Sequence, residues 1–142
     1  MLDEIHRALT QRRAQICARW EALLRGEPVA SPLGHPDTLV FGIRDAVREI
    51  VASMRTPPNE PTPEPADCTC GRNPLQAFYR AGEQALLETL VLIQAEHGAL
   101  SPEQRDATFA ELRRAIHHVK HREIGALAAV CQLEPKTPPG GK

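Results

Sequence analysis

The sequence lacks several features that mark common classes of protein. Its net charge is only −1 over 142 residues, so no basic surface predicts a nucleic-acid ligand. Charged residues interrupt its apolar runs, which are far shorter than a membrane span. The first residues have no apolar core like that of a secretory signal, which favours the cytoplasm. In that reducing compartment, the four cysteines are expected to be thiols or metal ligands rather than disulfides.

Signatures of catalysis are also missing. The sequence has no glycine-rich phosphate loop, no serine in a nucleophile elbow and no Cys-x-x-Cys-His motif for covalent haem. It does not contain the two Glu-x-x-His motifs of a di-iron helical bundle. A cysteine nucleophile at Cys70 with a histidine base stays open, but the pattern as a whole favours a protein that is not an enzyme.

Proline, in contrast, is abundant and divides the chain. The run 56–67, TPPNEPTPEPAD, holds five of the 13 prolines and cannot form a helix or a central strand, so we expect a stiff connector. The segment 134–142, EPKTPPGGK, is expected to be a disordered tail. The rest of the sequence predicts a single domain over 1–133, which is long enough to bury a core of its own.

Between the proline-rich runs, apolar residues recur with helical spacing and show no convincing strand alternation. The only tryptophan, Trp20, falls on the first apolar face, so we expect it to be buried. The segment 101–104, SPEQ, has the pattern of a capping box. Helices are predicted over about 3–25, 38–55, 73–97 and 102–133. We therefore predict an all-α fold, an antiparallel four-helix bundle with a Pro-rich connector between helices two and three and a long C-terminal helix.

The segment 12–26, RRAQICARWEALLRG, precedes a proline-containing loop and a second amphipathic helix. In this respect it resembles the N-terminal helical sensory domain of RsbT co-antagonist proteins, which also precedes some bacterial sensor kinases. The likeness depends on Ile16, Trp20 and the pair Leu23–Leu24 and extends over about the first 55 residues. It implies a helical sensory or regulatory input domain that acts through a protein partner.

Two thiols, Cys68 and Cys70, stand in the stretch 67–74, DCTCGRNP, just before the third predicted helix. If the third and fourth helices form a hairpin that turns at 98–101, residues whose numbers sum to about 200 lie opposite each other. Cys131 is then expected near the two thiols.

Other groups could complete such a site. His6 is within reach if the first helix starts at the same end of the bundle, and Glu134 is another neighbour, whereas Cys17 lies too far along the first helix. Zinc accepts sulfur and nitrogen ligands in a tetrahedral set. One hypothesis is thus a zinc or iron site whose ligands are Cys68, Cys70, Cys131 and His6. A redox-sensing thiol cluster and a turn with incidental thiols are the alternatives.

Histidines form a second group of candidates. His117 and His121 are four residues apart, a spacing that holds metals on helices, while His118 is expected to face solvent. A partly solvated helix face is the simpler interpretation of the pair. His97 continues the apolar face of the third helix, and His35 could approach it to bind a cofactor or sense pH. A histidine that stabilises the helix end is the simpler account.

The sequence therefore supports two hypotheses. The first is a non-enzymatic bacterial sensory or regulatory helical domain that acts through a protein partner or as a homodimer. The second is a metal-binding or redox thiol protein, with zinc as the expected metal. Neither nucleic acid nor a membrane is expected as a partner.

Overall fold

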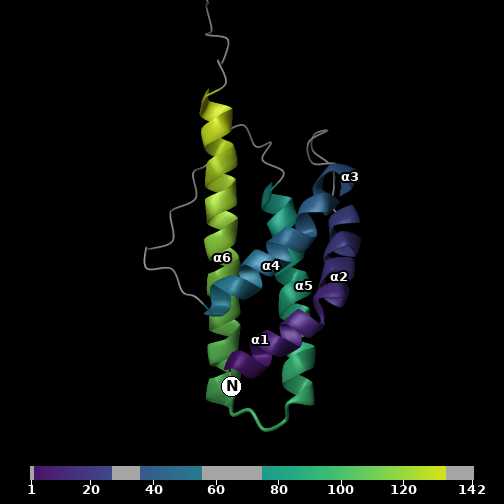
Figure 1. Cartoon of the computed structure of the whole chain (residues 1–142), viewed down its shortest axis with the longest axis vertical. Helices are drawn as coiled ribbons and strands as arrows, with labels where there is room; N and C mark the ends of the chain where they lie inside the picture. The colour runs from purple at the N-terminus through teal and green to yellow at the C-terminus, as the bar shows by residue number, and fades with distance from the viewer. Residues whose placement is uncertain (1, 27–35, 56–74, 134–142) are drawn as a thin grey trace, which may run out of the picture.

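The computed structural model of the chain describes residues 2–26, 36–55 and 75–133 (Figure 1). Every element in this part of the chain is helical, so the predicted all-α fold is confirmed for it. The elements are, in chain order, α1 (Leu2–Gln11), α2 (Arg13–Arg25), α3 (Pro36–Leu39), the short 3-10 helix η2 (Val40–Gly42), α4 (Ile43–Arg55), α5 (Leu75–Glu96) and α6 (Pro102–Leu133).

Three expectations fall outside the described residues. They are the proline-rich connector at 56–67, the Asn73–Pro74 start of the third helix and the disordered tail at 134–142. Each of them stays a prediction, as does the single domain over 1–133.

The helices α5 and α6 form an antiparallel hairpin against which the other helices pack (Figure 1). α2 lies along α5, α4 contacts both α6 and α2, and α1 contacts α4 and α5. In the view of Figure 1, α1 and α4 cross the hairpin obliquely. α6 has 32 residues, as the sequence predicted, and its last turns extend beyond the start of α5 (Figure 1).

Contacts across the hairpin fix its register. The Gln94 side-chain amide donates a hydrogen bond to Thr108 Oγ1 at 2.7 Å, and His117 Nε2 lies 3.7 Å from Glu83 Oε2. In both pairs the residue numbers sum to about 200, the register expected from the sequence. α6 also begins as predicted: Ser101 Oγ accepts from the Gln104 N–H at 3.1 Å, and Gln104 Oε1 accepts from the Ser101 N–H at 2.9 Å. This reciprocal pair is a capping box.

The apolar faces of α1, α2, α4, α5 and α6 meet in one core. Trp20 is fully buried, as expected, and its indole N–H donates to the Phe78 carbonyl at 2.9 Å. The two aromatic rings lie 4.9 Å apart, centre to centre. The indole lies directly over Gly82, where an added Cβ would overlap its six-membered ring. The absence of a side chain at Gly82 therefore allows α2 to approach α5 closely.

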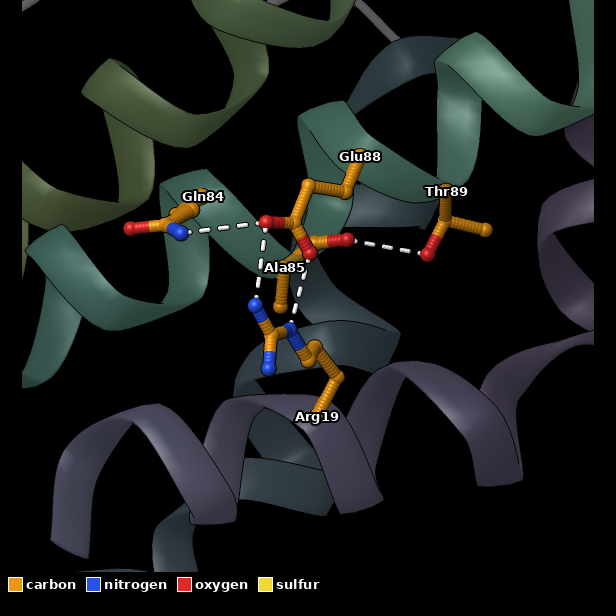
Figure 2. A network of polar contacts seen from close by, with 5 residues as sticks. All are labelled: Arg19, Gln84, Ala85, Glu88 and Thr89. Carbon is orange, nitrogen blue, oxygen red and sulfur yellow. Dashed lines mark hydrogen bonds and ion pairs between the residues drawn. The ribbon is translucent and has the colours of Figure 1, made fainter. Parts of the chain in front are cut away.

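A polar network reinforces the same junction on its exposed side. The Arg19 guanidinium donates to both carboxylate oxygens of Glu88, at 2.8 and 3.2 Å, and the Gln84 amide donates to one of them at 3.0 Å (Figure 2). The hydrogen bonds from Arg19 lower the pKa of the Glu88 carboxyl. Since the pair is about half exposed, it orients α2 on α5 more than it stabilises the fold.

The single helix predicted over 3–25 is wrong in one respect, because the chain bends at Arg12 between α1 and α2. Arg12 has φ −100° and ψ 16°, and its N–H reaches the carbonyls of Ala8 and Leu9, both at 3.1 Å. Its side chain pairs with Glu96 at the end of α5. The bend lets α1 cross toward α4 while α2 continues along α5.

The helix predicted over 38–55 is also interrupted. It starts as the short α3 and the 3-10 turn η2, and becomes a regular α-helix only at Ile43. The turn leaves Phe41 83% exposed. At the other end of α4, the Arg114 guanidinium of α6 donates to the Ser53 carbonyl at 2.8 Å. A cation near the carbonyl end of a helix is favourable, so this contact secures α4 on the hairpin.

Candidate functional site

Two hollows meet at the bend between α1 and α2. The larger, of about 490 Å³, lies between α2 and the start of α4, and the smaller, of about 220 Å³, lies between α1 and the rest of α4. Thr10 and Arg13 line both, so the two hollows are neighbours, and we call them together the bend groove. Its apolar lining comes mainly from Ala14, Ala18, Val40, Ile43, Val47 and Val51.

The charged lining of the bend groove is mainly cationic. Arg13 of α2 and Arg44 of α4 line the larger hollow, and neither forms an ion pair with another residue in the described part of the chain. The one acidic residue of this hollow, Glu21, pairs with Arg25 at 3.0 Å. The two guanidinium groups thus leave an excess of positive charge beside an apolar surface.

The thiol of Cys17 also lines the larger hollow. Burial raises its pKa, and the charges of Arg44 and Arg13 oppose that rise only in part. A raised pKa disfavours the thiolate, which is the form that acts as a nucleophile and as a metal ligand. Cys17 is distant from the other cysteines along the chain, so its spacing did not indicate its place in a groove.

Of the proposed thiol site, the structure describes little. Cys68 and Cys70 lie outside the described residues, and Cys131 belongs to α6 but its side chain is not described. The register of the hairpin agrees with the pairing rule from which the three cysteines were expected to lie close together. His6 lies in α1, which is found beside the α5–α6 turn, whereas α6 ends at the other extreme of the molecule (Figure 1). His6 was expected near the thiols only if the first helix started at their end of the bundle, and that condition is not met. The set of three thiols stays a prediction.

The histidine at the end of α5 has a structural role. His97 follows α5, and its Nδ1 lies 3.0 Å from the carbonyl oxygen of Ile93, in agreement with a helix-ending role. His35 is outside the described residues, so a pair with His97 stays a hypothesis. His118 was expected to face solvent, which is wrong: it is half-buried, and its Nδ1 is buried with no hydrogen-bond partner among the described residues. One turn before and one turn after it, Arg114 and Arg122 contact Ser53 and Glu49, so α4 lies along this face of α6.

His117 and His121 form a close pair of titratable side chains on α6. Their rings lie 5.7 Å apart and are nearly parallel, at 17°. Glu83 of α5 approaches from across the hairpin, 3.7 Å from His117 Nε2, and Arg113 lies 3.9 Å from the same carboxylate. Glu83 is a neighbour that sequence spacing alone did not indicate. Within the described ranges, no three His, Cys, Asp or Glu side chains are already placed to hold a metal ion.

Comparison with protein-family models gives no match, and comparisons with curated proteins and with solved structures give none either. Among the helices of the described residues, none combines the length and the apolar character that crossing a membrane requires.

Proposed function

We propose that this chain is a non-enzymatic regulatory domain that binds a protein partner through the bend groove. The observation that carries the proposal is the combination of an apolar lining with two guanidinium groups, Arg13 and Arg44, that have no ion-pair partner among the described residues. An apolar groove between helices is a common docking site for an amphipathic helix.

The charge of the groove defines the chemistry of the partner. A segment with apolar residues on one face and Asp or Glu at the edges would place its carboxylates on Arg13 and Arg44. Arg48 lines the smaller hollow and adds positive charge, although Asp45 lies 3.6 Å from it. Phe41, next to Val40 of the groove, offers an exposed aromatic anchor of the kind that dominates many interfaces.

The sensory role, the cytoplasmic location and the antiparallel four-helix bundle arrangement belong to this proposal. The weak likeness to the sensory domains of RsbT co-antagonist proteins supports the choice of a regulatory function over a catalytic one. A homodimer is the alternative mode of action. Val91 and Leu92 on α5 support it, since they are 52% and 58% exposed and could meet a second copy.

The groove is tested by reversing one of its charges. Proteins captured from the source cells by the tagged chain are identified, purified and titrated against the wild type and against Arg44→Glu. We expect at least one acidic partner to lose about tenfold or more in affinity, which is about 1.4 kcal/mol. Arg105→Glu, an exposed reversal on α6 away from the groove, is the matched control and should bind like the wild type.

Two results would contradict the proposal. One is a partner that binds wild type and Arg44→Glu equally well. The other is an assembly that consists only of copies of this chain and is disrupted by Val91→Glu rather than by Arg44→Glu, which would favour the homodimer.

A second candidate function is a zinc or redox site at Cys68, Cys70 and Cys131. It is favoured by the register of the hairpin, since the contact between Glu83 and His117 agrees with the pairing rule from which the convergence of these thiols was argued. Zinc is the expected cofactor of this alternative, and no cofactor is needed for the groove.

A further inference from the structure

A cluster of possible metal ligands lies on the α5–α6 hairpin, apart from both the bend groove and the cysteines. His117 and His121 are one helical turn apart on α6 with their rings side by side, and Glu83 of α5 faces His117. All three are partly buried, so their side chains are held near one another while solvent can still reach them. The helix pair that carries them belongs to the common core.

The spacing of these groups is close to that of a metal shell. Metal–nitrogen and metal–oxygen bonds of about 2.0–2.2 Å place neighbouring donors of a tetrahedral site about 3.3 Å apart. His117 Nε2 and Glu83 Oε2 are 3.7 Å apart, so a small movement brings them into range. Two imidazoles that share one metal have ring centres about 5–6 Å apart by the same bond lengths. The rings of His117 and His121 are 5.7 Å apart.

The orientation of the rings is what must change. Two nearly parallel rings cannot both hold a metal in their own planes, so at least one must turn about the bond to its ring. That torsion has broad minima in histidine, so the turn needs little free energy. Histidines four residues apart on one helix face bind zinc together in well-known motifs.

We propose that His117, His121 and Glu83 bind one divalent transition-metal ion, with water as the remaining ligand. Imidazole nitrogens with a single carboxylate suit Zn²⁺, Ni²⁺ and Cu²⁺ better than Mg²⁺ or Ca²⁺, which prefer oxygen. The ion would join α5 to α6 near the middle of the hairpin. Arg113 lies 3.9 Å from Glu83 and competes with the metal for the carboxylate.

The test uses the full chain with Cys68, Cys70 and Cys131 replaced by serine, so that the proposed three-thiol site cannot account for binding. Zn²⁺ is titrated by calorimetry, and thermal unfolding is followed with and without Zn²⁺. We expect one ion per chain and a higher midpoint of unfolding with Zn²⁺, since a ligand of the native state stabilises it. Circular dichroism without metal confirms that each variant is folded.

Variants then assign the ligands. His117→Ala and His121→Ala should each lose at least tenfold in Zn²⁺ affinity, and Glu83→Gln should weaken binding to a smaller extent. His97→Ala, which removes a histidine elsewhere on the hairpin, should bind Zn²⁺ like the parent. The proposal is overturned if the parent with three serines binds no Zn²⁺, if either histidine variant binds as the parent does, or if Glu83→Gln has no effect.

Discussion

At the scale of single residues, the contact between Trp20 and Gly82 sets how closely α2 packs on α5. Glycine inside a helix is less favourable than alanine by about 1 kcal/mol. Here that cost is offset, because any side chain at this position would overlap the buried indole ring. Gly125 of α6 is the opposite case, since a Cβ there would meet nothing within 4 Å.

The two glycines give a matched pair of substitutions. Gly82→Ala should lower the free energy of unfolding by about 1–3 kcal/mol, because overpacking outweighs the gain in helix propensity. Gly125→Ala should raise it by about 0.5–1 kcal/mol, because only the propensity term changes. Urea unfolding of both variants measures the difference. Equal stabilisation by the two substitutions would show that the indole does not rest on Gly82.

At the scale of the elements, a buried polar pair sets how α5 and α6 lie against each other. Thr108 is fully buried and Gln94 nearly so. The Gln94 amide donates to Thr108 Oγ1 at 2.7 Å and to the Arg105 carbonyl at 3.1 Å. A shift of register would leave these groups buried without partners, which is costly.

Thr108→Val, a change of nearly the same shape, should therefore lower the free energy of unfolding by about 1–3 kcal/mol, because one amide hydrogen of Gln94 loses its acceptor. Thr89→Val is the control. Thr89 is also buried, but its hydroxyl donates only to the Ala85 carbonyl one turn back in its own helix (Figure 2). Chemical denaturation should thus show a clearly smaller loss for Thr89→Val, and a similar loss would argue against the role of Gln94.

The same scale shows what sequence reasoning could and could not predict. The start of α6 could be predicted from Ser101 and Gln104, because a capping box is a local signal. The bend at Arg12 could not, because arginine is a good helix former and its side chain pairs with Glu96, 84 residues away, a contact that local sequence does not indicate. Element types were thus predictable, but not breaks that depend on tertiary contacts.

At the scale of the whole molecule, ion pairs connect the helices around the apolar core. Arg19–Glu88 and Arg122–Glu49 each join two helices, Arg12–Glu96 joins the bend between α1 and α2 to α5, and all are partly exposed to solvent. Exposed pairs contribute little, about 0–1 kcal/mol each, and salt screens them. The buried apolar side chains must supply most of the stability.

We therefore expect the free energy of unfolding to change by less than about 2 kcal/mol when the salt concentration rises from about 0.1 M to about 1 M. Urea titrations at both concentrations measure the change. Arg19→Gln serves as a control for a single pair and should cost less than about 1 kcal/mol. A loss of several kcal/mol in high salt would mean that the ion pairs, rather than the core, hold the helices together.

The candidate sites differ in how far the sequence could indicate them. The spacing of His117 and His121 is visible in the sequence, but Glu83 joins them only through the hairpin. The bend groove depends on the way α1 and α2 meet α4, so Cys17, Arg13 and Arg44 could not be grouped in advance. Such sites are built from crossing helices, and their geometry is a property of packing rather than of spacing.

The burial of Trp20 has an optical consequence. Indole fluorescence shifts to shorter wavelength in apolar surroundings, and the chain has a single tryptophan, which is fully buried against Phe78 and Gly82. Its emission therefore reports one place, the junction of α2 with α5, and not an average over the chain. A ligand or partner that loosens this junction will be visible in the spectrum of the unlabelled protein.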